Sequence, residues 1–298
     1  MSVPDAKAAV VARDGRRRRS RSRGRARRTG MPVSVALCAV VLAAVILCAI
    51  APGLLAPQDP ALIDPAGGLQ TASGAHLLGT DALGRDVLSR VVAGARSALV
   101  GPLILTSATV VVSTFLALVA GYLGGWFDAV VSRVADTVYA LPALIVTIVI
   151  VGVFGGGWWL AIGVLVVFNT PTALRILRAA VIERRDLPYV EAARTIGASR
   201  WSIMVRHLLP NLEPMVVTCF FLGFTYGMVE LSALSFLGLG VPPGSPDWGR
   251  MLSENRVQVA QNPWAAVAPG IAIVATVLSA NILGGWIYER LERRKRER

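Results

Sequence analysis

Charge is scarce in this sequence, and the charged residues that are present lie in clusters. They make up 16% of the 298 residues, whereas hydrophobic residues make up 54%, and the mean hydropathy is +0.60. A soluble globular domain carries charge at about a quarter of its positions. Long uncharged stretches separated by short polar segments are typical of helical membrane proteins. The composition therefore predicts an all-α protein that crosses a membrane several times.

Histidine and cysteine are also rare, and the common catalytic motifs are missing. The sequence has 2 His and 3 Cys. Cys38, Cys48 and Cys219 all lie in apolar runs, which indicates neither a disulfide framework nor a metal site. No G-x-x-x-x-G-K-[ST] phosphate loop is present, so the chain is not expected to bind ATP itself. H-E-x-x-H and G-x-S-x-G are absent as well. We therefore expect a protein that is not an enzyme and has no cofactor of its own.

Positive charge is concentrated at the two ends of the chain. The net charge is +12, and of the 30 Lys and Arg, 11 precede residue 31 and 6 follow residue 289. Residues 1–30 are too charged and too poor in apolar side chains to fold, so we expect a disordered cytoplasmic tail near an anionic membrane surface. Nucleic-acid binding and a twin-arginine export signal are the alternatives there. Residues 290–298 are expected to form a second basic cytoplasmic tail, and no nucleic-acid partner is expected.

Six apolar stretches are long enough to cross a membrane, given the roughly 20 residues that a spanning helix needs. They are expected at residues 31–56, 97–126, 130–153, 158–174, 215–239 and 264–288. The third and fourth are separated by three consecutive glycines within a long uncharged run.

The polar segments between these stretches indicate the orientation of the chain. An external loop is expected at residues 57–96, followed by a helical core over 97–289. This core includes a cytoplasmic loop at 183–210 and a second external loop at 240–263. Seven arginines lie between residues 175 and 206, whereas the expected external segments hold five arginines and no lysine. Because positive charge is enriched on the cytoplasmic side, both termini are expected in the cytoplasm.

Residues 188–210 form a polar island whose order predicts two short helices joined at a glycine. Pro188 suits a first helical turn, and Gly197 is a natural C-terminal stop. Ser199 can cap the second helix, which Pro210 is expected to end. One apolar stripe is expected on that second helix, comprising Trp201, Met204, Val205, Leu208 and Leu209. This stripe suggests docking to a cytoplasmic partner, and the alternative is a surface hairpin without a specific role.

Two segments of the expected spans contain polar groups that require an explanation. Glu230 lies deep in the fifth span, where an ionisable residue is costly and is a functional candidate by default. It is expected either to line a polar pathway or to hydrogen-bond a neighbouring helix, and Asn169 in the fourth span is a second pathway candidate. Asp136 lies one turn from Arg133, which predicts a local ion pair between them.

Three motifs, taken in order, resemble those of the permeases of bacterial ABC importers for dipeptides, oligopeptides and nickel. Residues 76–90 read HLLGTDALGRDVLSR, similar to the family's H-P-L-G-T-D-x-x-G-R-D-V-x-S-R with Leu77 where proline is usual. Residues 191–193 read EAA and are followed by Gly197, as in the family's coupling loop. Residues 236–240 read FLGLG and are followed by DWG at 247–249. The resemblance covers about residues 52–288. It breaks off after Gly284, where the family usually has an aspartate.

The resemblance implies a plasma-membrane permease subunit with the type I importer fold that forms a translocation pathway for peptides. Import of nickel or another small solute is the alternative, and a channel or membrane enzyme without an ATPase is the alternative from another class. The implied partners are a second permease, two ATPase subunits that bind the ATP, an external substrate-binding protein and the lipid bilayer.

The resemblance also implies three groups of site residues. The residues expected to couple the chain to the ATPases are Glu191, Ala192, Ala193, Arg194, Gly197, Trp201, Leu209 and Pro210. The apolar stripe would fill a groove on the ATPase, and Glu191 would pair with or cap groups there. Glu230 and Asn169 are expected in the pathway. The motif residues of the external loops are Gly79, Asp81, Gly84, Arg85, Asp86, Trp248 and Gly249.

Overall fold

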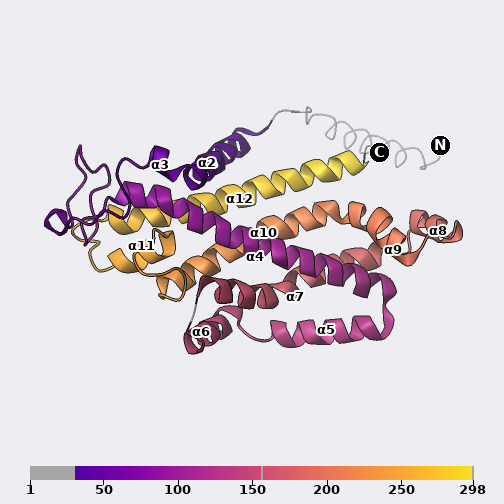
Figure 1. Cartoon of the computed structure of the whole chain (residues 1–298). Coiled ribbons are helices and arrows are strands. Elements are labelled where there is room, and N and C mark those ends of the chain that lie inside the picture. Colours follow the sequence, from indigo (N-terminus) through magenta and orange to yellow (C-terminus); the bar gives the residue numbers. More distant parts are fainter. Residues whose placement is uncertain (1–30, 156, 297–298) are drawn as a thin grey trace, which may run out of the picture.

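The computed structural model describes residues 31–155 and 157–296, and this part of the chain is a bundle of helices (Figure 1). The helices are α2 (Val33–Ile50), α3 (Pro52–Leu55), η1 (Pro65–Gly67), α4 (Val87–Leu123), α5 (Gly125–Tyr139), α6 (Ala143–Val153), α7 (Trp158–Arg184), α8 (Pro188–Thr195), α9 (Arg200–Ser202), η2 (Ile203–Leu208), α10 (Leu209–Phe236), α11 (Trp248–Asn255) and α12 (Trp264–Arg296). The only extended pairing within these residues is an isolated bridge between Thr80 and Asp86. The predicted all-α class is confirmed. The basic tail at 1–30 lies outside the described residues.

Five helical segments are long and apolar enough to cross a membrane, and a sixth span exists if the bent pair α5–α6 is counted as one. The five are Val33–Ile50, Val87–Leu123, Trp158–Arg184, Arg200–Phe236 and Trp264–Lys295. The prediction of a polytopic membrane protein is therefore confirmed. The expected continuous third span is wrong, because α5 and α6 meet at an angle of 78°. Pro142, which directly precedes α6, explains the break, since proline cannot continue a helical hydrogen-bond ladder.

α4 is longer than the apolar stretch from which a second span was expected. Asp86 caps it, and its side chain accepts a hydrogen bond from the backbone N–H of Ser89 at 2.8 Å. The helix therefore begins at Val87 and runs for 37 residues, or about 55 Å at 1.5 Å per residue. This exceeds the roughly 30 Å of a bilayer's hydrocarbon core. One end of α4 consequently reaches into the polar segments that surround α11.

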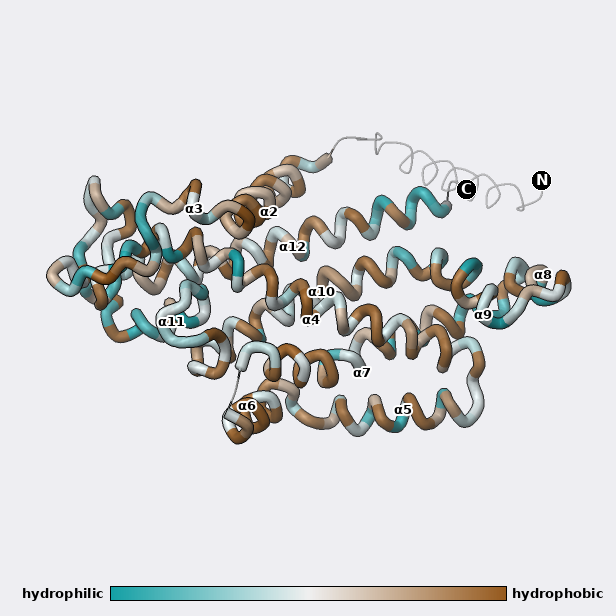
Figure 2. The backbone as a smooth tube through the Cα atoms, in the orientation of Figure 1, coloured by the Kyte–Doolittle hydropathy of each residue, from teal (hydrophilic) through white to brown (hydrophobic). Residues whose placement is uncertain are grey.

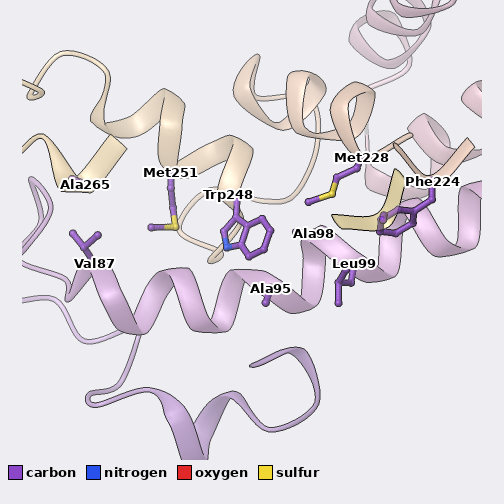
Figure 3. Packing of buried hydrophobic residues seen from close by; sticks show 10 residues of the cluster. Val87, Ala95, Ala98, Leu99, Phe224, Met228, Trp248, Met251 and Ala265 are labelled. Carbon is purple, nitrogen blue, oxygen red and sulfur yellow. The ribbon is translucent and has the colours of Figure 1, made fainter. Parts of the chain in front are cut away.

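α4 also lies at the centre of the bundle, where it packs against α7, α10 and α2 (Figure 1). α12 packs against α10 and α2. Near α11, small residues such as Ala95 and Ala98 on α4 let Trp248 and Met251 approach, and Met228 of α10 joins the same buried cluster (Figure 3). Because the cluster also includes Ala265 and Ala280 of α12, it ties α11 to three of the spanning helices.

The two ends of the bundle are polar, and the middle is apolar (Figure 2). The α11 end comprises residues 56–86, α11 and the loops that flank it, and it lies at the left of Figure 1. The α8 end comprises α8, α9, η2 and the last turns of α12, at the right. Between them, apolar side chains on the outside of the bundle are exposed, for example Leu37, Val111 and Val274. Such a surface suits contact with lipid chains.

Candidate functional site

The α8 hairpin, residues 188–202, begins and turns where its sequence predicts. Pro188 lies in the first turn of α8. After the helix, Gly197 adopts φ 81°, a left-handed conformation that glycine enters without steric cost. The N–H of Ala198 bonds the carbonyl of Ala193 at 3.1 Å, which closes the helix end as a Schellman motif. Ser199 then caps the next helix by accepting a hydrogen bond from the N–H of Ser202 at 3.2 Å.

The expected stop at Pro210 is wrong, because the chain stays helical from Arg200 to Phe236. Pro210 lies in the first turn of α10, directly after the π-helical turn η2. Proline offers no N–H, and its ring crowds the carbonyl of the preceding turn. A π-helical turn widens the helix by one residue and so accommodates this crowding. The second half of the predicted hairpin is therefore the beginning of a long spanning helix.

The apolar stripe on this second helix lies largely inside the chain. Met204 and Leu208 are buried against Val190 and Ala193 of α8. The prediction that the stripe fills a groove on a partner is wrong for these residues, because α8 folds back and covers them. Trp201 differs from them, since it is 59% exposed. The buried part of the stripe anchors α8 to the long helix that contains α10.

The other face of α8 remains exposed. Glu191 lies in the first turn with its side chain in the open, and the described residues provide no ion-pair partner for it. Ile196, which the sequence reasoning missed, is 83% exposed. An apolar residue directly before a helix-ending glycine was the available signal. Arg194 turns back: its guanidinium lies 5.3 Å from the ring centre of Tyr122 and donates to the carbonyl of Arg185 at 3.2 Å.

The other coupling candidates differ in exposure. Ala192 is exposed beside Glu191, whereas Ala193 is 3% exposed. Leu209 is half-buried and Pro210 exposed at the beginning of α10. The α8 hairpin thus consists of an inner face that holds it in place and an outer face, comprising Glu191, Ala192, Ile196 and Trp201, that is open to a partner.

A cavity of about 310 Å³ lies between α4, α5, α7 and α10. Its lining includes the polar residues Thr106, Thr109, Tyr139, Asn169, Tyr226 and Glu230. The two pathway candidates meet here, since the Asn169 side-chain amide donates to Glu230 Oε2 at 2.7 Å. The interpretation that Glu230 hydrogen-bonds a neighbouring helix is therefore confirmed, and Glu230 also lines this cavity; its place in a translocation pathway stays a prediction.

Two glycines let α10 approach α4 beside this cavity. A Cβ on Gly227 would lie 2.6 Å from Leu105 Cδ2, and a Cβ on Gly223 would lie 3.1 Å from Thr106 Cγ2. Small residues four positions apart are a common way for two membrane helices to pack closely. This close approach places Thr106 and Glu230 in the lining of one cavity.

Asp136 does not pair with Arg133 as expected. Its carboxylate accepts a hydrogen bond from Arg175 of α7 at 2.7 Å. The same guanidinium lies 4.3 Å from the ring centre of Tyr139. The local expectation is wrong because α5 packs along α7, which brings the guanidinium of Arg175 to this carboxylate.

At the α11 end, the charged motif residues pair with one another inside the protein. Arg85 Nε donates to Asp81 Oδ2 at 2.6 Å, and its Nη2 donates to Glu254 Oε2 at 2.8 Å. Asp86 accepts from Ser89 and lies 3.0 Å from His76 Nδ1. Asp81, Arg85 and Asp86 are all buried.

The glycines of the first motif allow this loop to close. A Cβ on Gly84 would lie 1.8 Å from the backbone oxygen of Asp64, and one on Gly79 would lie 2.2 Å from that of Gln70. Both glycines have φ above 70°. The loop can therefore fold tightly over the beginning of α4 only with glycine at these two positions.

The second external motif attaches α11 to the spanning helices. The Trp248 indole donates to the carbonyl of Val91 at 2.8 Å, and a Cβ on Gly249 would lie 2.2 Å from the backbone oxygen of Ser232. Asp247 caps α11 by accepting from the N–H of Arg250 at 3.0 Å. Burial raises the pKa of Asp247 above its ordinary value, and hydrogen bonds from neighbouring backbone and side-chain groups oppose this rise.

Within residues 31–155 and 157–296, no group of three or more His, Cys, Asp or Glu side chains could hold a metal ion. What the described chain does contain is several membrane-crossing helices, a polar cavity between them and an ordered hairpin at one end. This combination defines a multi-pass membrane protein of the transport class.

Comparison with known proteins identifies the family. Residues 113–297 match the family described as the binding-protein-dependent transport system inner membrane component. The glutathione transport system permease protein GsiD of Pectobacterium atrosepticum is 36% identical over 220 residues, covering 74% of this chain and 73% of that protein. The dipeptide transport system permease protein DppC of Alkalihalophilus pseudofirmus is 36% identical over 230 residues, covering 77% of this chain and 75% of that one.

One chain of an inward-facing structure of the MetNI methionine ABC transporter aligns with this protein at 20% identity and a TM-score of 0.46. The alignment covers 63% of this chain and 94% of that chain. The chain belongs to the binding-protein-dependent transport family, and it is a multi-pass inner-membrane permease of an ABC importer. Its relatives are transport permeases rather than enzymes. Membership implies an ATPase and a substrate-binding protein as partners.

Proposed function

We propose that this permease imports peptides, together with a second permease, two ATPase subunits and an external substrate-binding protein. The relatives support this cargo, since they are named as permeases for glutathione and for dipeptides. ATP is bound by the partner ATPases, because the sequence has no phosphate-binding loop. Nickel or another small solute is the alternative cargo.

The α8 end faces the cytoplasm, and the α11 end faces outward. Charge supports this orientation, because seven arginines lie between residues 175 and 206 and five more lie after residue 289 together with Lys295. The segments at the α11 end, residues 56–96 and 240–263, hold five arginines and no lysine. Cytoplasmic segments of membrane proteins carry the excess of positive charge.

The observation that carries the proposal is the division of α8 into an anchored face and an exposed face. Val190 and Ala193 are buried against the beginning of the long helix, so a force on α8 is transmitted to that helix. Glu191, Ile196 and Trp201 remain exposed for an ATPase to contact. An amphipathic element that presents a few apolar anchors is a common way to occupy a groove on a partner.

The long helix connects this docking surface to the polar cavity. It is helical without interruption from Arg200 to Phe236 and contains Glu230 near its far end. From residue 200 to residue 230 the helix rises about 45 Å at 1.5 Å per residue. Movement of the α8 hairpin during ATP hydrolysis would therefore shift the cavity wall, in which Glu230 and Asn169 line the translocation pathway.

The proposal is tested by reversing the charge at the exposed face of α8. In the complete transporter, reconstituted in proteoliposomes with its binding protein, we expect Glu191→Lys to lower ATP-dependent dipeptide uptake at least about tenfold. Such a loss corresponds to about 1.4 kcal/mol of interaction with the ATPase. The matched control is Glu289→Lys, an identical charge change at an exposed site on α12. Uptake by both variants at the parent rate, with equal protein in the membrane, would contradict the docking role.

The second variant tests the turn rather than the charge. Gly197→Val has open space around its side chain, but the φ of 81° is strained for valine. We expect insertion to be normal and uptake to fall.

Co-purification of the tagged chain in mild detergent separates this mechanism from a channel or an enzyme. A second permease and an ATPase should accompany the parent chain, whereas recovery of the chain alone would favour those other classes.

A further inference from the structure

The cavity between α4, α5, α7 and α10 is lined by a single acidic side chain among the described residues. Among the described residues that line it, Glu230 alone is ionisable at neutral pH, and the rest are hydroxyl, amide or apolar. Asn169 donates to Glu230 Oε2, and none of the described residues donates to Oε1. One carboxylate oxygen is therefore left to accept hydrogen bonds from a group inside the cavity.

Two hydroxyl groups in the same lining also lack partners. Thr106 and Thr109 are 1% and 5% exposed, and neither Oγ1 atom has a hydrogen-bond partner among the described residues. A buried polar atom without a partner is rare in folded proteins and requires an explanation. Both residues line the cavity, but each Oγ1 atom is closed to solvent, so these hydroxyls can accept a hydrogen bond from a bound group only after the side chain rotates about χ1.

The arginine next to the cavity lining in the sequence is paired with a different carboxylate. Arg175 precedes the lining residue Ile176, but its guanidinium is bonded to Asp136 at 2.7 Å and stacks on the ring of Tyr139. Its charge is therefore compensated outside the cavity. Tyr226 lies one turn before Glu230 on α10 and contributes an aromatic ring, a group that attracts cations. The Glu230 carboxylate and the Tyr226 ring both suit a positively charged donor.

From this arrangement we infer that the cavity binds an ammonium group of the transported solute. The inference rests on the proposed import of peptides, since peptides with a free N-terminus carry such a group. An ammonium has three N–H donors and no acceptor, which suits the carboxylate oxygen Glu230 Oε1, to which none of the described residues donates. The volume of about 310 Å³ is at the small end of ligand pockets, so it accommodates one end of a peptide rather than a long chain.

The inference is tested first without any cargo, by labelling a cysteine placed in the cavity. In the complete transporter, Cys38, Cys48 and Cys219 are replaced by alanine, and Tyr226→Cys is introduced. Position 226 is one helical turn from Glu230, so the two side chains are about 6 Å apart. The reagents are two methanethiosulfonates, one with a 2-aminoethyl group and one with a 2-sulfonatoethyl group, which carry opposite charges.

We expect the cationic reagent to react faster than the anionic one, and Glu230→Gln to lower this rate ratio about tenfold. Glu289→Gln is the matched control, because it removes an exposed carboxylate on α12 and should leave the ratio unchanged. A ratio that Glu230→Gln leaves within twofold of the parent would overturn the inference. A cysteine that reacts with neither reagent would overturn it as well, since the cavity would then be closed to ions.

The second measurement uses cargo and separates this inference from the proposed function. Uptake of a dipeptide is compared with uptake of its N-acetylated form, in the parent and in Glu230→Gln, with the same binding protein. For each protein, the preference is the uptake of the free dipeptide divided by the uptake of its N-acetylated form. The binding protein is the same in both cases, so its own preference cancels when the value for the parent is divided by the value for Glu230→Gln. We expect the parent's preference for the free amine to fall about tenfold in the variant. If the parent imports the dipeptide and Glu230→Gln keeps the parent's preference for the free amine, the ammonium site alone is overturned. If the cysteine labelling is charge-selective but the parent imports no peptide, the proposed peptide cargo is overturned.

Discussion

The two ends of the bundle use their polar residues in opposite ways. At the α11 end, Asp81 and Arg85 are buried and bonded to each other, and Arg85 also donates to Glu254. At the α8 end, Glu191 is exposed and has no ion-pair partner among the described residues. Each end contains a sequence motif that resembles the same transporter family. One motif is therefore buried within the fold, whereas the other leaves part of its residues on the surface.

This contrast has an energetic consequence. Removing one partner of a buried ion pair leaves an uncompensated charge and costs about 3–5 kcal/mol. Substitutions at exposed positions away from such features change stability by about 0.5 kcal/mol or less. Breaking the buried ion pairs at the α11 end should therefore destabilise the protein, whereas changes on the exposed face of α8 should leave it folded and impair transport.

The largest effect is expected from Arg85→Ala. This change leaves Asp81 and Glu254 without their closest donor, and Arg90 remains near them at 3.7 and 3.5 Å, too far for a hydrogen bond. We expect a loss of about 3 kcal/mol, measured as a lower midpoint of thermal unfolding in detergent. Arg256→Ala is the control at the same end, because that exposed side chain hydrogen-bonds Ser253, lies 5.8 Å from the ring centre of Phe236 and forms no ion pair with any described residue. If Arg85→Ala and Arg256→Ala lowered the unfolding midpoint equally, the buried ion pairs would contribute no more to stability than an exposed side chain does.

The next effect is on transport rather than on stability. Ile196→Asp places a charge on the exposed face of α8, and we expect dipeptide uptake and its coupled ATP hydrolysis to fall at least about tenfold. The unfolding midpoint should stay at the parent value, because Ile196 is 83% exposed. Val257→Asp provides the comparison, since Val257 is 78% exposed at the α11 end. If Val257→Asp uncouples ATP hydrolysis equally, the assignment of coupling to α8 fails.

The smallest effect is a change in the pH dependence of stability at the α11 end. Burial raises the pKa of Asp247 above its ordinary value of 3.8. Between pH 3.8, where the unfolded chain releases this proton, and the raised pKa of the folded chain, the folded chain binds more protons than the unfolded chain. The free energy of unfolding therefore falls as the pH rises through this window. This contribution is fully lost above the raised pKa.

Asp247→Asn should remove that slope and change stability by less than about 1 kcal/mol, because asparagine also caps helices. The measurement is the unfolding midpoint from pH 4 to pH 8, with Asp59→Asn as an exposed control. A slope that survives in Asp247→Asn would show that another group causes it.

Local sequence signals determined the positions of most helices and several of their ends. The apolar stretches correspond to spanning helices because a backbone in lipid must satisfy its own hydrogen bonds. Asp86, Ser199 and Gly197 act through their own side chain or backbone on residues within one turn. Such effects do not depend on the rest of the fold, so they can be read from the sequence.

Only the tertiary structure decided which polar and apolar groups meet. Asp136 pairs with Arg175 across 39 positions, and Asn169 bonds Glu230 across 61. The apolar stripe that begins at Trp201 is the clearest case. Its spacing predicts one apolar face but not what covers it, and α8 covers Met204 and Leu208 while leaving Trp201 exposed. Hydrophobic burial has no direction of its own, so the partner of such a face depends on which elements the whole chain brings beside it.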